Sequence, residues 1–177
     1  YSTGDISSNS GDDIGGIVGR NETATFSLNI GAKVINCYSL GTIKGDENIG
    51  GVVGNNVRSE VSNCYSTGTV TATNLYANYG FAGGIVGTAN EESTVRNNIA
   101  FNSDITAKAH ANRIAYFSNM TNVTLENNYA NSSMTVTEDD SSKTGESNDT
   151  TIWGADRANM TDITAPYSTW DFDSDND

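Results

Sequence analysis

The chain has 177 residues, the length of one ordinary domain, and carries a net charge of −13 at neutral pH. Because phosphate binding needs clustered Lys and Arg, 22 acidic against 9 basic residues exclude a nucleic-acid partner. No run of 18 apolar residues occurs, so we expect no membrane insertion by this fragment. The chain begins at Tyr1 without Met, and we therefore expect it to be a piece of a longer, processed protein.

A glycine-rich motif recurs along the first 137 residues. It reads Ile-Gly-Gly-Ile-Val-Gly at 14–19, Ile-Gly-Gly-Val-Val-Gly at 49–54 and Ala-Gly-Gly-Ile-Val-Gly at 82–87, with a degenerate fourth copy at 113–118. These runs lack the i, i+3, i+4 spacing of a helix and contain too many glycines for one. They predict short parallel strands, stacked in register, at 14–18, 49–53, 82–86 and 114–117.

A second motif alternates with the first. It reads Val-Ile-Asn-Cys-Tyr-Ser at 34–39 and Val-Ser-Asn-Cys-Tyr-Ser at 61–66, with worn copies at 95–100 and 125–130. An apolar residue follows each copy in a short strand, namely Ile43, Val70, Ile105 and Met134. The asparagines that the four copies share are predicted to stack as an amide ladder: Asn36, Asn63, Asn97 and Asn127.

Each repeat therefore contains three short strand-like pieces joined by turns, and no repeat could bury its apolar residues alone. Stacked at the ~4.8 Å spacing of paired strands, the repeats become the coils of a solenoid. The sequence thus predicts an all-β protein, a parallel β-helix of about five coils over residues 1–137.

The Gly-Gly-Ile/Val-Val-Gly cores with intervening Asn-Cys-Tyr-Ser resemble the GLUG-motif family over about three quarters of the chain. Those repeats occur in bacterial surface and secreted proteins, including adhesin-like proteins and the non-catalytic parts of IgA-cleaving metallopeptidases. The resemblance implies a right-handed β-helix located outside the cell or on the bacterial cell surface, as part of a larger protein. It implies no reaction, because function belongs to sites and not to folds.

The last 40 residues do not continue the repeat. Residues 138–151 are polar and predict a loop in which Gly145 tolerates substitution. Residues 152–177 are rich in aromatic side chains and predict a cap over the last coil, formed by Trp153, Trp170 and Phe172. Stacking of exposed Trp side chains on a sugar is the functional alternative.

No pattern in the sequence indicates catalysis. The chain has one histidine, His110, placed in a turn before the fourth glycine motif and expected to be an exposed spectator. No HExxH or G-x-S-x-G motif occurs, and the arginines fall at scattered repeat positions. Catalysis by a pair of carboxylates remains an alternative, since parallel β-helices also host polysaccharide lyases and hydrolases.

Two further features concern cysteine and calcium. Cys37 and Cys64 occupy the same repeat position, and parallel side chains on adjacent coils suit free thiols better than the roughly 90° torsion of a disulfide. The acidic tail resembles the first half of a calcium loop, with candidate ligands Asp171, Asp173, Asp175 and Asp177. The match is partial, because Asn176 replaces the usual Gly and the final Glu is missing. We therefore expect no cofactor, and calcium is the alternative.

These observations give two hypotheses of function. The first is a non-enzymatic cell-surface module, either a rigid stalk or an adhesin-like domain with a glycan or protein partner. The second is a carbohydrate-active β-helix of the lyase or hydrolase kind. Turnover of a polysaccharide distinguishes the second from the first.

Overall fold

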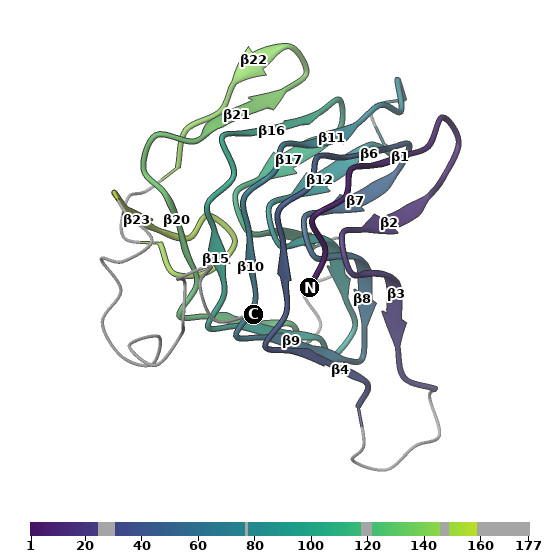
Figure 1. Cartoon of the computed structure of the whole chain (residues 1–177), viewed down its shortest axis with the longest axis vertical. Coiled ribbons are helices and arrows are strands. Elements are labelled where there is room, and N and C mark those ends of the chain that lie inside the picture. Colours follow the sequence, from purple (N-terminus) through teal and green to yellow (C-terminus); the bar gives the residue numbers. More distant parts are fainter. Residues whose placement is uncertain (25–30, 77, 118–121, 146–148, 159–177) are drawn as a thin grey trace.

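The computed structural model describes all residues except 25–30, 77, 118–121, 146–148 and 159–177. Its regular structure is entirely β, in short parallel strands that wind into a β-solenoid of about four turns (Figure 1). The predicted fold class is confirmed, with one coil fewer than the five expected. No helix long and apolar enough to cross a membrane occurs in the described part of the chain.

Each coil is built from five short strands, and not from the three that the repeat suggested. The first coil contains β1 (Ile6–Ser7), β2 (Asp13–Gly15), β3 (Val18–Glu22), β4 (Lys33–Ile35) and β5 (Tyr38–Ser39). The second contains β6 (Ile43–Gly45), β7 (Asn48–Gly50), β8 (Val53–Val57), β9 (Glu60–Ser62) and β10 (Tyr65–Ser66). The third contains β11 (Val70–Ala72), β12 (Phe81–Gly83), β13 (Val86–Asn90), β14 (Thr94–Arg96) and β15 (Ile99–Ala100). The fourth contains β16 (Asp104–Ala107), β17 (His110–Asn112), β18 (Ala115–Phe117), β19 (Thr124–Glu126) and β20 (Tyr129–Asn131), and β21 (Thr135–Glu138), β22 (Ser141–Ser142) and β23 (Ala155–Arg157) follow it.

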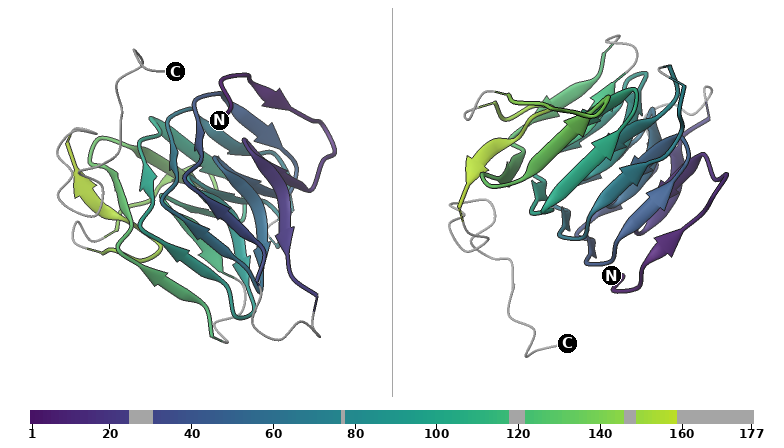
Figure 2. Two further views of the ribbon diagram at one scale, coloured as in Figure 1. Left: turned by 60° about the horizontal axis from the view of Figure 1, so that its bottom comes forward. Right: turned by 90° about the horizontal axis from the view of Figure 1, so that it is seen from above.

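Equivalent strands of successive coils form five sheets, which we call walls I to V (Figure 2). Wall I contains β1, β6, β11, β16, β21 and β22, and wall II contains β2, β7, β12 and β17. Wall III contains β3, β8, β13 and β18, wall IV contains β4, β9, β14 and β19, and wall V contains β5, β10, β15, β20 and β23. Every pair of neighbouring strands is parallel except β21 and β22.

The register confirms three copies of the glycine motif and corrects two details. Each copy was predicted as one strand, but the glycine pair forms a corner, so each copy contributes one strand to wall II and one to wall III. The fourth copy begins at Ala111 and not at 113, because Gly83 pairs with Asn112. It lacks a counterpart of Gly87, since the pairing passes from Val86–Ala115 directly to Thr88–Tyr116. The fourth copy is thus one residue shorter than the others, and this deletion hid its correct alignment in the sequence.

The interior is divided into two lobes by a narrow waist. One apolar cluster lies among walls III, IV and V, and the other lies between walls I and II. At the waist, a Cβ atom on Gly51 would lie 2.7 Å from the Cβ of Ser66, and one on Gly84 would lie 2.8 Å from the Cβ of Ala100. Ordinary carbon contacts are ~3.5–4.0 Å, so no side chain fits at these positions. The second glycine of each pair is therefore required by this close approach.

The asparagines of the second motif have a role that the sequence interpretation missed. Asn36, Asn63, Asn97 and Asn127 have φ values of 57°, 54°, 56° and 52°. Asn tolerates this left-handed conformation better than most residues, and each one turns the chain from wall IV into wall V. The expected stacking is present between the first two, where Asn63 Nδ2 donates to Asn36 Oδ1 at 3.2 Å.

The fully buried amide ladder lies one position later. Asn98 Nδ2 donates to Asn128 Oδ1 at 3.1 Å, and Asn98 Oδ1 accepts the backbone N–H of Cys64 at 2.9 Å. The side-chain amides of Asn98 and Asn128 also donate to the backbone carbonyls of Val61 and Val95. Asparagine thus replaces cysteine in the later coils because the site offers backbone partners, which a buried amide needs.

Part of the segment that follows β22 in the chain covers the last coil. Trp153 is 7% exposed and packs in the lobe between walls I and II, as expected of a cap, whereas Trp170 and Phe172 lie outside the described residues. Within the predicted loop of residues 138–151, Ser141 and Ser142 form β22, which pairs antiparallel with β21. Gly145 lies against the Trp153 ring, where a Cβ atom has no space, so the expectation that it tolerates substitution was wrong.

Candidate functional site

The outer corner between walls II and III is concave, and we call it the notch. Outward side chains from the two walls meet there, which only a concave corner permits. Asp13 of β2 binds Arg20 of β3 through an ion pair of 3.0 Å, and its other oxygen accepts from Asn48 at 2.8 Å and from Asn55 at 3.3 Å. Thr88 of β13 donates to Asn48 Oδ1 at 2.6 Å. The N-terminal half of the notch is therefore lined by amides, a hydroxyl and one ion pair.

The C-terminal half of the notch is aromatic. Tyr116 stacks on Phe81 with ring centroids 4.6 Å apart and on His110 with centroids 4.5 Å apart. His110 begins β17 and does not lie in a turn as predicted; its side chain is 41% exposed, and Nδ1 lies 3.6 Å from Glu138 Oε1. Burial, and then the negative charge of Glu138, raise the pKa of Tyr116. The three rings stack nearly parallel to one another.

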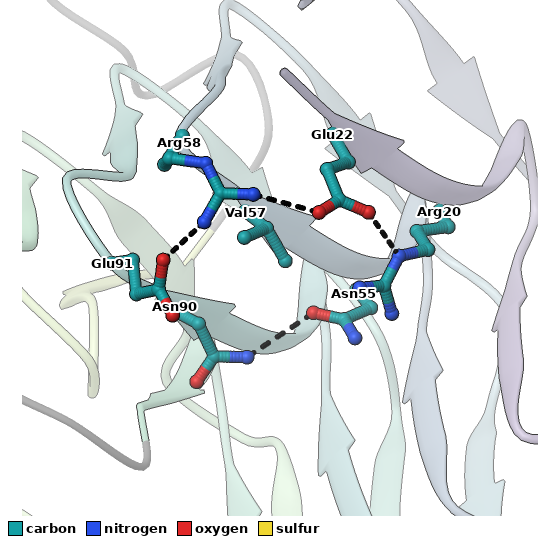
Figure 3. A pocket seen from close by; sticks show the side chains of 7 residues that line it. All are labelled: Arg20, Glu22, Asn55, Val57, Arg58, Asn90 and Glu91. Atoms are coloured by element: carbon teal, nitrogen blue, oxygen red, sulfur yellow. Dashed lines mark hydrogen bonds and ion pairs between the residues drawn. The ribbon is translucent and has the colours of Figure 1, made fainter. Parts of the chain in front are cut away.

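A groove of about 550 Å³ continues from the notch across wall III (Figure 3). Its lining residues are Arg20, Glu22, Asn55, Val57, Arg58, Asn90 and Glu91. The side chains alternate in charge along three coils. Glu22 receives Arg20 Nε and Arg58 Nη2, both at 2.7 Å, and Arg58 also pairs with Glu91. Hydrogen bonds from Arg20 and Arg58 keep the pKa of Glu22 below its usual value.

Two side-chain amides lie beside these charges. Asn90 Nδ2 donates to Asn55 Oδ1 at 3.2 Å, on the floor of the groove (Figure 3). An Arg–Glu network of this kind holds its own shape, because each cation has two acceptors and each carboxylate has a donor. The charged side chains that line the groove are all paired with one another or with Asp13. The groups that the groove offers to a polar ligand are therefore amides and the edges of the guanidinium groups.

Carboxylates gather at a second place, where walls I and II meet. Burial raises the pKa of Glu47, and the nearby carboxylates of Asp12, Asp46 and Asp13 raise it further. On wall IV, Glu60 shows the opposite behaviour. Burial alone would raise its pKa, but hydrogen bonds from Lys33, Arg96 and Ser62 lower it to about 2.

The predicted site residues have different outcomes. Cys37 and Cys64 are both free thiols, and burial raises the pKa of Cys64 to about 12. A thiol with that pKa is not a nucleophile at neutral pH. The calcium candidates Asp171, Asp173, Asp175 and Asp177 all lie outside the described residues, so calcium binding stays a prediction. Within the described residues, no group of three or more His, Cys, Asp or Glu side chains is arranged to hold a metal.

Sequence reasoning missed the arginines. Arg20, Arg58 and Arg96 seemed scattered over the repeat frame, yet each pairs with a carboxylate of a neighbouring coil or strand. The signal was present in Arg20 and Glu22, two residues apart and therefore on one face of a strand. Arg113 is buried and donates from Nε to the Trp153 carbonyl at 2.8 Å, so it fastens the cap.

Comparison with known proteins supports the repeat assignment. The family model described as the GLUG motif matches residues 45–71, which trace one turn of the solenoid from the end of β6 into β11. Residues 45–71 therefore carry a GLUG motif. No curated protein sequence matches the chain. Among solved structures, it is similar to a candidate immunoglobulin A1 protease from Bacteroides ovatus, with 25% identity and a TM-score of 0.65. The similarity covers 89% of this GLUG-motif chain and 48% of that protein, so this chain spans about half its length.

Proposed function

We propose that this GLUG-motif solenoid is a non-catalytic module of a bacterial surface or secreted protein, which displays binding groups on a rigid column. The observation that carries the proposal is that equivalent strands of successive coils pair in register within each of the five walls. Because equivalent residues stack on successive coils, outward side chains form columns at the ~4.8 Å spacing of paired strands. A fixed column of this kind presents a ligand with pre-organised contacts, which reduces the entropy lost on binding.

The wall III groove supports binding over catalysis. A carboxylate can act as a general base or a nucleophile only when it is free to accept a proton or to attack a substrate. Both oxygens of Glu22 accept from arginines, and a lowered pKa makes this carboxylate a weak base. The amides of Asn55 and Asn90 beside it suit the hydroxyl groups of a glycan or the backbone of a protein.

The comparisons support the proposed location. The similar Bacteroides protein is named for an action on immunoglobulin A1, a substrate found outside the bacterial cell. This chain corresponds to about half of that protein, which fits a module within a larger extracellular protein.

A second candidate function rests on Glu47. A carboxyl group whose pKa is raised by burial and by neighbouring carboxylates has the property of the acid in a glycosidase pair. Asp12 and Asp46, whose charges act on Glu47, are the candidates for the second carboxylate that such a reaction requires. This alternative predicts turnover of a polysaccharide, which the first proposal excludes.

The deciding experiment is an activity screen of the purified chain, with and without calcium. Polysaccharides, peptides and esters are incubated with the chain, and reducing ends, unsaturated sugars and free acids are measured. We expect no turnover, together with binding on a glycan array or to extracellular matrix proteins. The matched variants are Glu47→Gln and, as a control on wall IV, Glu126→Gln. Turnover that is lost in Glu47→Gln and retained in Glu126→Gln would overturn the proposal in favour of the enzyme.

A further inference from the structure

Residues 73–80, of which all but residue 77 are described, form a connection that we call the insert loop, and it is six residues longer than the corresponding connections of the second and fourth coils. They join β11 to β12, whereas two residues join β6 to β7 and two join β16 to β17. The solenoid continues through this coil as through its neighbours, because β12 pairs in register with both β7 and β17. The extra residues are therefore not needed to connect wall I to wall II.

The insert loop has a built frame. Asn74 is 9% exposed, and its backbone N–H donates to the Asp46 carbonyl at 3.1 Å. The Asn74 side chain donates to Asp46 Oδ2 at 3.3 Å and accepts the N–H of Tyr76 at 2.9 Å. The N–H of Tyr79 donates to the Tyr76 carbonyl at 3.1 Å. These bonds fasten the start of the loop to the coil beside it and form a turn between Tyr76 and Tyr79.

The frame presents large apolar side chains to water. Leu75 is 82% exposed, Tyr76 74% and Tyr79 52%. They make up half of the six exposed large apolar residues in the described part of the chain. Burying such side chains against a partner is favourable, because apolar surface is removed from water. A cluster of them on a non-structural insertion marks a contact surface, and Tyr is a residue that interfaces favour.

The base of the insert loop is acidic. Asp46 binds the start of the loop, and the Glu47 carbonyl accepts the N–H of Phe81 at its end, at 2.8 Å. Burial and the carboxylates of Asp12, Asp46 and Asp13 raise the pKa of Glu47, so these groups repel one another. A cation placed beside them relieves that repulsion, which favours a basic partner over an acidic one.

We propose that the insert loop docks a protein partner whose contact face has an apolar pocket surrounded by basic residues. The proposal rests on the proposed binding function and names its partner class. A sugar fits less well, because the most exposed side chain, Leu75, has no ring to stack on a pyranose. An anionic membrane fits less well still, because Asp46 and Glu47 would face its headgroups.

The test uses three synthetic 15-residue peptides and the full chain. The first alternates Lys and Arg with Leu, Phe and Trp; the second replaces the basic residues by Asp and Glu; the third replaces the apolar residues by Ser. Binding is measured by fluorescence anisotropy at several salt concentrations. We expect the basic–apolar peptide to bind at least tenfold more tightly than either control. Equal affinity for all three peptides overturns the proposal.

Variants localise the binding. Leu75→Ser with Tyr76→Ser should weaken binding at least tenfold, and Asp46→Asn with Glu47→Gln should weaken it and flatten its salt dependence. Leu40→Ser, at a half-exposed apolar side chain outside the loop, is the matched control and should bind as the parent does. Equal losses in Leu40→Ser and in the loop variant contradict the proposal.

A shortened chain separates docking from folding. Replacing residues 73–80 by Asp-Glu, the connection of the preceding coil, should leave the melting temperature nearly unchanged and abolish peptide binding. If the shortened chain still binds the peptide, the insert loop is excluded as the binding site. A glycan-array signal lost in Tyr76→Ser but kept in Leu75→Ser transfers the site to a sugar. Turnover in the activity screen would refute the non-catalytic function alone, since peptide binding is measured without it.

Discussion

Replacing Gly51 by Ala is the sharpest test of the narrow waist. A Cβ atom at this position would lie 2.7 Å from the Cβ of Ser66, and closer still to the Ser66 hydroxyl and the Gly84 carbonyl oxygen. Because carbon atoms pack at ~3.5–4.0 Å, the coil has to move by about 1 Å. The Gly84 oxygen belongs to the backbone of the next coil, so rotation of a side chain cannot relieve the clash.

The expected cost follows from two contributions. Overpacking a filled interior costs about 1–3 kcal/mol. Moving the coil also weakens the ladder bonds beside Gly51, where its N–H donates to the Gly83 carbonyl at 3.1 Å and the N–H of Val52 donates to the Ile85 carbonyl at 2.9 Å. At about 1 kcal/mol for each hydrogen bond, the total loss of unfolding free energy is about 3–5 kcal/mol.

The assay is urea unfolding followed by far-ultraviolet circular dichroism, with melting as a second measurement. For a chain of this size, about 2–4 °C of melting temperature corresponds to 1 kcal/mol. Gly51→Ala should therefore melt roughly 6–20 °C below the parent. Gly4→Ala is the matched control, because nothing lies within 4 Å of a Cβ atom there. Equal midpoints for the two variants would refute the waist and the packing argument built on it.

Three further predictions concern the cap, the pH dependence and the thiols. Arg113→Met should lower the free energy of unfolding by about 3–5 kcal/mol and red-shift Trp153 fluorescence, because the buried carbonyls and carboxylate that face the guanidinium lose their partner. The pKa of Glu60 is about 2 in the folded state, so the contribution of Glu60 to the free energy of unfolding is present above its ordinary pKa near 4.5 and is lost as pH falls toward 2. Glu60→Gln should therefore flatten the dependence of stability on pH between pH 5 and 2, and urea midpoints measured across this range would show it. Because burial raises the pKa of Cys64 to about 12, iodoacetamide at pH 8 should leave Cys64 unmodified in the folded chain and alkylate it in urea, as peptide mass spectrometry would show; prompt modification in the folded chain would contradict its burial.

The candidate site was the least predictable part of the molecule. Asp13 and Arg20 are recognisable as a pair only when walls II and III are known to meet in a concave corner. The insert loop likewise requires the register, because only the pairing of β12 with both neighbours shows that the connection over residues 73–80 is longer than the coil needs. His110 looked isolated in the sequence, and its stacking on Tyr116 depends on the missing residue in the fourth glycine motif.

The sequence by itself determined the parallel solenoid and its repeat length. Stacked coils place equivalent residues in equivalent surroundings, so apolar residues and glycines recur at one period, and that period is visible without coordinates. The path of the chain within a coil was decided only in the tertiary structure. The five walls, the waist and the notch depend on contacts across a single coil, such as that between Gly51 and Ser66, which are made once per turn between unlike residues. A repeat reports which residues are equivalent, but it carries no information on which unlike residues touch.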